Sequence, residues 1–223
     1  MTEIKCLDHG FVALVDTMGT DRTPAQCART SFRNAGQDRT EEQDAKLTNY
    51  LVRNHHTTPL EFVQARFYIK APIFVARQIM RHRTASINEV SYRYVEAKPE
   101  FYVPELDKLT KRPANTKQGR SDELVDTPYG LQREIRYLYK EAFDSYEALL
   151  HNGLAPEVAR IVLPLGTYTE WYWQNDMNNI LKFLSLRMDE HAQYETRVYA
   201  NAVHDLLLPQ YPNILAAWGV SHA

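Results

Sequence analysis

Apolar and polar residues alternate along the segment EFVQARFYIKA, residues 61–71. Val63, Ala65, Phe67 and Ile69 fall on one side of an extended chain, and the polar residues between them fall on the other. This period of two residues is typical of a strand with one buried face. Content of aromatic and β-branched residues predicts further strands over 3–18, interrupted at Gly10, over 100–106 and over 166–174.

Capping and proline positions predict the helices. Thr40 stands before two glutamates and Gln43, which indicates a helix that runs to about His55. Prolines suited to the first turn predict helices that open at residues 24, 72, 128 and 156. Residues 178–208 carry a helical period, whereas residues 107–126 are polar and predict a mobile loop.

The order of these elements bears on the fold class. Helices and strands alternate irregularly, without the 30-residue rhythm of repeated βαβ units. We therefore predict an α+β fold with a mixed, largely antiparallel sheet flanked by helices. With 223 residues and 25.9 kDa, we expect one domain over residues 1–223.

Composition excludes several classes of protein. The chain is 44% hydrophobic and 24% charged, as in ordinary soluble proteins, and no apolar run approaches membrane-spanning length. The start MTEIKCLDHG lacks the apolar core of a signal peptide, and Cys6 and Cys27 are too few for a disulfide framework. We therefore expect a cytoplasmic protein without a membrane partner. Neither GxGxxG nor GxxxxGK[ST] is present, so any nucleotide is held by other means.

Charge is unevenly distributed along the chain. The whole chain has a net charge of −2, but residues 62–95 hold six basic residues and one acidic residue, a net charge of +5. A basic cluster within an acidic protein favours a small anionic ligand over a nucleic acid.

The basic cluster includes the segment RHRTASINEVSYRY, residues 81–94. Arginine side chains bind phosphates and carboxylates through two hydrogen bonds, and Asn88, Glu89, Ser91 and Arg93 add further polar groups. RHR also stands where a helix is expected to end, and basic residues there stabilise the helix dipole without any ligand. The whole segment indicates a nucleotide site better than a cap alone.

This segment resembles the signature RHRxxSxNExSxR of the flavin-dependent thymidylate synthases. Further similarity lies in ARTSF (28–32), HHTTPLEF (55–62), VARIVLPL (158–165) and NILKFLSLRMDEHAQYE (179–195). The resemblance implies conversion of dUMP to dTMP, with methylenetetrahydrofolate as the carbon donor and NADPH as the reductant through bound FAD. It also implies a homotetramer with active sites between subunits. Classical thymidylate synthases use a cysteine in a Pro-Cys motif, and neither Cys6 nor Cys27 follows a proline, which agrees with a mechanism without a cysteine nucleophile.

The resemblance also implies roles for individual residues. Those expected at dUMP are Gln78, Arg81, Glu89, Ser91, Arg93, Arg160 and Arg187. Those expected at FAD are Ser31, His56, Thr58, Glu61, Arg81, His82, Arg83, Glu89, Asp176, Asn178, Lys182 and His191. At residues 176–182 the chain departs from the Asn-x-Arg…Asn pattern of some members, because Asp176, followed by Asn178, places negative charge where an arginine can stand, and Lys182 restores a cation one turn later. Arg187 is the expected catalytic residue, since a buried guanidinium needs a partner and would stabilise negative charge on the uracil ring.

Other interpretations of these residues remain open. Arg160 and the acidic segment at 189–191 also fit solvated helix faces, and His55, His56 and Glu61 lack the spacing of a metal site, so no metal is expected. Ser91 has no evident histidine–acid pair beside it, so we expect it to bind and not to attack. Two alternative functions remain: a folate-dependent pyrimidine nucleotide C5-hydroxymethyltransferase, and a nucleic-acid-binding module that stacks bases on Tyr92 and Tyr94.

Overall fold

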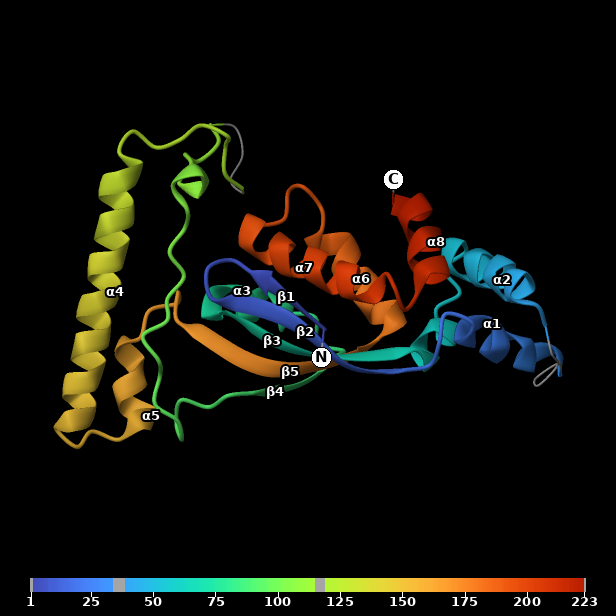
Figure 1. Cartoon of the computed structure of the whole chain (residues 1–223), viewed down its shortest axis with the longest axis horizontal. Coiled ribbons are helices and arrows are strands. Elements are labelled where there is room, and N and C mark those ends of the chain that lie inside the picture. The colour runs from blue at the N-terminus through green and yellow to red at the C-terminus, as the bar shows by residue number, and fades with distance from the viewer. Residues whose placement is uncertain (1, 34–38, 115–118, 223) are drawn as a thin grey trace.

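The architecture is an antiparallel sheet with most helices on one face, in a computed structural model that describes residues 2–33, 39–114 and 119–222 (Figure 1). The five strands follow the order β1-β2-β3-β5-β4. They are β1 (Thr2–Cys6), β2 (Gly10–Met18), β3 (Gln64–Pro72), β4 (Ser86–Glu89) and β5 (Tyr168–Asp176). Every pair of neighbouring strands in this described sheet is antiparallel, so the α+β class is confirmed and the expected mixed sheet is wrong.

The buried face of the sheet is the one that the sequence alternation predicts. Ala65, Phe67 and Ile69 of β3 are at most 1% exposed, and Phe67 and Ile69 stand opposite Trp173 and Trp171 of β5. These large side chains pack under the helices, which gives the sheet its main source of stability through burial of apolar surface. Tyr68 and Tyr172 point to the other face, where their rings lie 4.9 Å apart.

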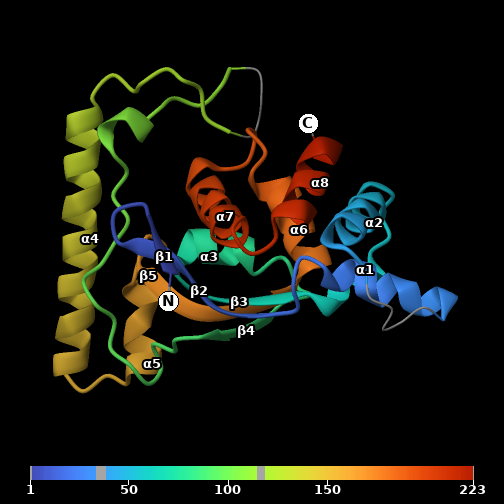
Figure 2. The same ribbon diagram turned by 45° about the vertical axis from the view of Figure 1, so that its right-hand side comes forward.

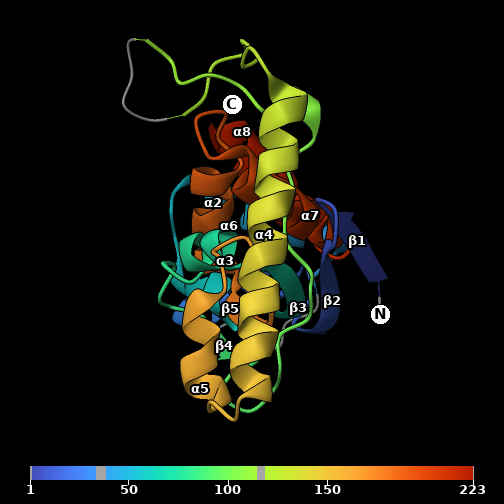
Figure 3. The ribbon, with the colours of Figure 1, turned by 90° about the vertical axis from the view of Figure 1, so that its left-hand side faces the viewer.

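Most helices cover this inner face. Helices α6 and α7 pack together above β1, β2 and β5, while α2 and α8 form a pair at the other end of the molecule (Figure 2). The helices are α1 (Thr23–Ala28), α2 (Glu41–Arg53), α3 (Ile73–Ile79), α4 (Pro128–His151), α5 (Pro156–Ala159), α6 (Met177–Arg187), α7 (Tyr194–Leu207) and α8 (Pro212–His222). Helix α4 stands beside one end of the sheet with α5 next to it (Figure 3).

Several predicted boundaries are confirmed. Helix α2 begins after Thr40, whose hydroxyl accepts a hydrogen bond from the Gln43 backbone while the Gln43 side chain accepts from the Thr40 backbone. This reciprocal capping box satisfies two donors at the helix start. Prolines open α1, α4 and α5 as predicted, although the Thr127 side chain makes no capping bond.

Other predicted elements differ from the structure. The helix over 178–208 is interrupted by a turn at residues 188–193, and the helix from Pro72 already ends at Ile79. The segment 100–106 forms only an isolated bridge from Phe101 to Thr167, because no longer run of it pairs with a neighbouring strand. Residues 115–118 of the predicted mobile loop lie outside the described residues. Helix α8 has no counterpart among the predicted elements.

One glycine allows a close approach in the core. A Cβ atom on Gly10 would lie 1.9 Å from the Tyr199 hydroxyl and 2.7 Å from the carbonyl oxygens of Cys6 and Lys70. The Tyr199 hydroxyl donates to the Lys70 carbonyl at 2.9 Å. Glycine at the start of β2 therefore lets α7 bond directly to the sheet. Within the part of the chain that the structure describes, no helix is both long and apolar enough to cross a membrane.

Candidate active site

A polar cluster of Arg187, His82 and Gln78 forms where the C-terminal ends of α3 and α6 meet. The guanidinium of Arg187 donates from Nε to Nε2 of His82 at 3.2 Å and from Nη2 to the main-chain carbonyl of Gln78 at 3.3 Å. Among the described residues, no carboxylate lies within ion-pair distance of Arg187. The positive charge is therefore available to a ligand.

The environment of Arg187 favours a ligand with negative charge. Its side chain is half-buried, and this burial lowers the pKa of the guanidinium from its ordinary value. Burial, and then the charge of Arg187, also lower the pKa of His82. Because Arg187 can only donate, Nε2 of neutral His82 is the acceptor and its proton is on Nδ1. The ring of His82 packs edge-on against Phe183 at 5.1 Å, which fixes its orientation. The guanidinium expected to be buried is thus only half-buried, and its neighbour Leu186 is 62% exposed.

The second half of the signature lies around a small cavity. Glu89 and Arg160 line a cavity of about 240 Å³ together with Arg77 and Tyr92. Glu89 accepts a hydrogen bond from the Thr169 hydroxyl at 2.6 Å, which anchors the end of β4 to β5. Arg160 donates from Nε to the Glu157 carbonyl at 3.3 Å. This arrangement offers one carboxylate and two guanidinium groups to a small polar ligand.

Strand β4 lies within the signature segment 81–94, for which the sequence predicted no strand. Its four residues are all exposed because it is the edge strand of the sheet, so neither face shows an apolar period. After it, the Oγ of Ser91 accepts from the Arg93 backbone at 3.3 Å, and the Arg93 guanidinium lies 3.2 Å from the Glu157 carboxylate. Both partners of this ion pair are about half exposed, so Arg93 can exchange Glu157 for a ligand.

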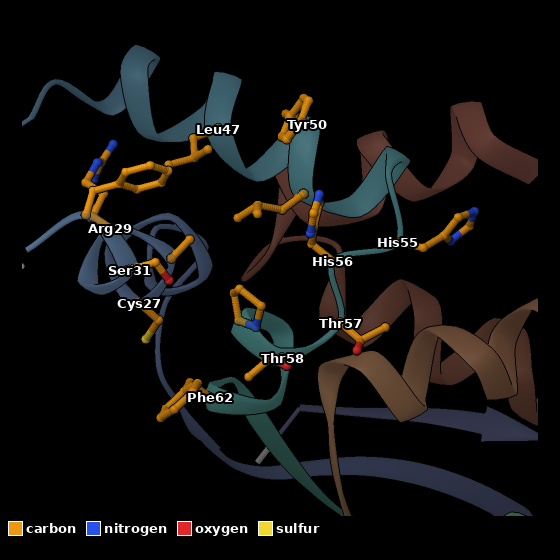
Figure 4. Close-up of a pocket in the computed structure, with 14 residues that line it drawn as sticks. Cys27, Arg29, Ser31, Leu47, Tyr50, His55, His56, Thr57, Thr58 and Phe62 are labelled. Carbon is orange, nitrogen blue, oxygen red and sulfur yellow. The ribbon is translucent and has the colours of Figure 1, made fainter.

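A larger cavity lies at the opposite end of the molecule, between α1, α2 and the 3₁₀ turns at residues 29–32 and 58–62 (Figure 4). Its volume is about 700 Å³, within the usual range of ligand sites. Ser31, His56 and Thr58 line it, as does Tyr50, whose ring stacks on His56 with centroids 5.6 Å apart. Phe32 and Phe62 are 78% and 54% exposed at this cavity. The lining thus combines aromatic surfaces with hydroxyl groups, which suits a planar heterocycle.

The remaining predicted residues are dispersed. Arg81, Arg83 and Lys182 are exposed, and Glu61 is an exposed residue outside the cavity lining. His191 is 85% exposed and its Nδ1 lies 3.0 Å from the Asp189 carboxylate. Asp176 caps α6 by accepting from the Asn179 backbone at 2.9 Å, and Asn178 is only 7% exposed. Two of the three residues at the departure from the family pattern thus already serve the start of α6.

Several residues at these sites were not predicted from the sequence. Arg77 and Tyr50 line cavities, and Gln193 accepts a hydrogen bond from the Gln78 side-chain amide at 2.6 Å. Gln193 falls within the block 179–195 that carried the family resemblance, so a signal was present, but its partner lies 115 residues earlier. In the described chain, no group of three or more His, Cys, Asp or Glu side chains is placed to hold a metal ion.

The chain matches a known protein family. Residues 13–213 match the model of a family described as "Thymidylate synthase complementing protein". The chain belongs to this family. A relative from Treponema denticola, named a flavin-dependent thymidylate synthase, is 48% identical over 208 residues that cover 92% of this chain and 77% of the relative. A relative of the same name from Gluconobacter oxydans is 45% identical over 221 residues, which cover 97% of this chain and 72% of the relative.

A solved structure also resembles the fold closely. It is a UMP/dUMP methylase from Streptomyces cacaoi bound with 5-Br dUMP. Its TM-score is 0.88 at 31% identity, with 97% of each chain covered. This family member thus shares both the architecture and recognisable sequence with a nucleotide methylase.

Proposed function

We propose that this protein is a flavin-dependent thymidylate synthase that converts dUMP to dTMP. Methylenetetrahydrofolate supplies the carbon, and NADPH supplies the reducing hydride. The observation that carries the proposal is the family membership, with relatives of this name at 45–48% identity, together with an Arg187 guanidinium that has no carboxylate partner among the described residues. The matching nucleotide methylase fold supports dUMP as the substrate.

The residues predicted to bind dUMP have the chemistry that a reacting uracil nucleotide requires. Arg187 would lie against the ring and stabilise negative charge that develops when C5 becomes nucleophilic. Arg160, Ser91 and Arg93 offer the donors that a phosphate requires, and Glu89 offers an acceptor. In this proposal Arg81 assists at the phosphate, where its exposed guanidinium is free to turn toward the ligand.

The chain lacks a suitable cysteine nucleophile for the uracil. Cys6 is buried, and burial raises the pKa of its thiol to about 12, so it stays protonated near neutral pH. Burial also raises the pKa of Cys27, which lies in the large cavity. Activation of the uracil therefore falls to charge stabilisation by Arg187. The two free cysteines also support the proposal of a reducing, cytoplasmic location.

The large cavity fits part of FAD. Ser31 and Thr58 supply hydroxyl groups, and His56 and Tyr50 supply a stacked pair. When bound, FAD would accept the hydride from NADPH and pass it on in the reduction. The residues His82, Arg83, Glu61, Lys182 and His191, and those at 176–178, are proposed to complete the flavin site from other parts of the assembly.

A homotetramer with active sites between subunits explains the distribution of these residues. Arg187 contacts the Gln78 carbonyl on α3, and Arg160 lines the small cavity beside Arg77 of the same helix, whereas Ser31 lines the large cavity at the opposite end of the molecule. Contact between copies would bring one subunit's group to another's. Sedimentation velocity reports the assembly state directly.

The product of the reaction tests the proposed function. Purified protein with dUMP, methylenetetrahydrofolate, NADPH and FAD is expected to give dTMP, identified by mass spectrometry, and to give none when FAD is omitted. Hydroxymethyl-dUMP as the product would instead support the alternative hydroxymethyltransferase. Absence of any reaction, with oligonucleotide binding that weakens steeply with salt, would support a nucleic-acid-binding module.

Cys27 provides an independent probe of the flavin cavity. We expect a thiol reagent at pH 8 to modify Cys27 in the FAD-free protein, whereas buried Cys6 reacts far more slowly. With FAD at ten times its dissociation constant, the rate at Cys27 should fall about tenfold, because only the free protein reacts. With a disulfide reagent that releases a coloured thiolate on reaction with a cysteine, the absorbance of that thiolate measures both rates.

The Cys27→Ser variant is the control, and it should lose the faster reaction. If saturating FAD leaves the Cys27 rate unchanged while flavin absorbance shows that FAD is bound, the flavin lies elsewhere.

A further inference from the structure

A buried carboxylate, Glu195, lies at the first turn of α7 and is connected to Gln78 through Gln193. Glu195 is 3% exposed. Its oxygens accept from the Tyr102 hydroxyl at 3.0 Å, from Nη2 of Arg120 at 2.7 Å to each oxygen, and from Nε2 of Gln193 at 2.9 Å. All three partners donate, so Glu195 is fully engaged as an acceptor.

Glu195 is ionised near neutral pH. Burial acts to raise its pKa, but the hydrogen bonds and charge of Arg120 together with other bonds outweigh burial, and the pKa lies below its ordinary value. An ionised carboxylate can only accept hydrogen bonds. The side-chain amide of Gln193 must therefore turn its nitrogen toward Glu195.

The orientation of the Gln193 amide in turn fixes the orientation of the Gln78 amide. With its nitrogen toward Glu195, Gln193 turns its carbonyl oxygen the other way, where it accepts from Nε2 of Gln78 at 2.6 Å. This contact uses one N–H of the Gln78 amide and fixes the orientation of that amide, so that its Oε1 points away from Gln193 and can accept from another group. An amide without such a constraint would have two orientations of similar energy.

Gln78 lies at the proposed nucleotide site. Its main-chain carbonyl accepts from Arg187, and its side chain is half-buried while that of Gln193 is exposed. A nucleotide held by Arg187 would therefore meet the Oε1 atom of Gln78. dUMP carries two donors that could meet it, the N3–H of the uracil ring and the 3′-hydroxyl of the sugar.

We propose that Glu195 is a positioning residue that fixes the amide of Gln78, through Gln193, so that Gln78 presents an acceptor to a donor group of the nucleotide. This inference rests on the proposed function, because it takes dUMP as the ligand. It assigns a role in substrate selection to two residues that make no contact with the substrate themselves. Arg120 supports them by keeping Glu195 charged.

Calorimetric binding of three nucleotides to the FAD-loaded protein tests the proposal. The probes are dUMP, N3-methyl-dUMP, which lacks the ring donor, and 2′,3′-dideoxyuridine monophosphate, which lacks the sugar donor. We expect the wild type to bind one of the two analogues about tenfold more weakly than dUMP, since a lost hydrogen bond at a polar site costs on the order of 1.4 kcal/mol. The analogue that weakens identifies the donor.

The variants then separate positioning from folding. Gln193→Leu breaks the connection at an exposed residue without removing the buried carboxylate, and Glu195→Gln removes the charge that sets the polarity. Both are expected to weaken dUMP binding about tenfold. The analogue ratio, which is the dissociation constant of the weaker analogue divided by that of dUMP, should then be close to one. Gln193→Leu should have no further effect in a Gln78→Ala background, as expected for residues that act through one another. Gln210→Leu, at another exposed glutamine near the end of α7, is the matched control and should bind like the wild type.

Two results would overturn the proposal. One is a Gln193→Leu variant that keeps the wild-type affinity and analogue ratio. The other is a wild type that binds dUMP and both analogues equally well. A wild type that neither binds dUMP nor forms dTMP would instead refute the proposed function, so the two failures are distinguishable.

Discussion

Replacing Arg187 by alanine is expected to lower kcat for dTMP formation by about 10²–10³-fold, the usual effect of removing one group that stabilises a charged transition state. The guanidinium is half-buried and has no carboxylate partner among the described residues, so its charge is not already neutralised. In a partly desolvated site such a charge acts more strongly than in water. Steady-state kinetics with product detection by mass spectrometry measures the effect.

The Arg187→Lys variant separates charge from geometry. A lysine keeps the positive charge but cannot donate to both His82 and the Gln78 carbonyl as the guanidinium fork does, so intermediate activity is expected. Arg133→Ala, at an exposed position of α4, should leave kcat unchanged. Bound-flavin absorbance shows that FAD is retained. An Arg187→Ala enzyme with turnover within threefold of the wild type would exclude this residue from the chemistry.

The elements predicted well from sequence are those whose signals are local. The alternation over β3 reports a face buried under helices, and the capping box of α2 needs only Thr40 and Gln43. Both follow from chemistry within a few residues along the chain. Neither required knowledge of the rest of the fold.

The errors arose where tertiary contacts decide the structure. Residues on both sides of the turn at 188–193 keep a helical period, so periodicity alone joined α6 to α7. At the break the Asp189 carboxylate accepts from the His191 backbone at 2.8 Å and competes with helical hydrogen bonding. Strand β4 gave no alternation because both of its faces are exposed, and its pairing with β5 depends on residues more than 80 positions later.

The candidate site shows the same division. Arg187 and the 81–93 signature could be singled out because their residue types are unusual for their surroundings. The connection from Gln78 to Gln193 and on to Glu195 could not, since glutamine and glutamate near a helix start are ordinary. Which residues share one active site also depends on neighbouring subunits in the proposed tetramer, which no single chain specifies.

The second large effect concerns Asp44, a buried carboxylate that connects α2 to the wall of the large cavity proposed to bind FAD. It is 1% exposed and lies 2.6 Å from Nε of Arg22 and 2.5 Å from Nη1 of Arg29. Arg29 begins the 3₁₀ turn that carries Ser31 into the cavity. We expect Asp44→Ala to lower the free energy of unfolding by about 3 kcal/mol, because Arg29 would be left buried without its partner. Arg22 contributes less, since its side chain is 38% exposed and can turn to solvent.

Urea unfolding at fixed protein concentration measures this loss. Asp16→Ala is the matched control, because Asp16 also pairs with an arginine, Arg66, at 3.0 Å but with both side chains exposed. That exposed pair should contribute less than about 1 kcal/mol. Equal losses in the two variants would show that burial gives Asp44 no special weight.

The pH dependence of the same pair provides an independent test. Burial acts to raise the pKa of Asp44, but the hydrogen bonds and charges of Arg22 and Arg29 outweigh it and lower the pKa below its ordinary value of 3.8. A group whose pKa is lower in the folded state contributes full stability above its unfolded pKa and loses that contribution as the pH falls through the folded value. The difference in unfolding free energy between the wild type and Asp44→Ala should therefore be constant from pH 7 to about pH 5 and shrink as the pH falls below about 4.

Loss of Asp44 should also weaken FAD binding. Without the carboxylate, the turn that holds Arg29 and Ser31 is no longer fixed to α2, so FAD must order that turn when it binds. We expect the FAD dissociation constant of Asp44→Ala to rise about tenfold at a temperature where the variant is folded, the result of roughly 1.4 kcal/mol spent on ordering. Fluorescence titration of FAD measures this change. An unchanged dissociation constant, with the stability loss still present, would mean that Asp44 supports the fold without shaping the cavity.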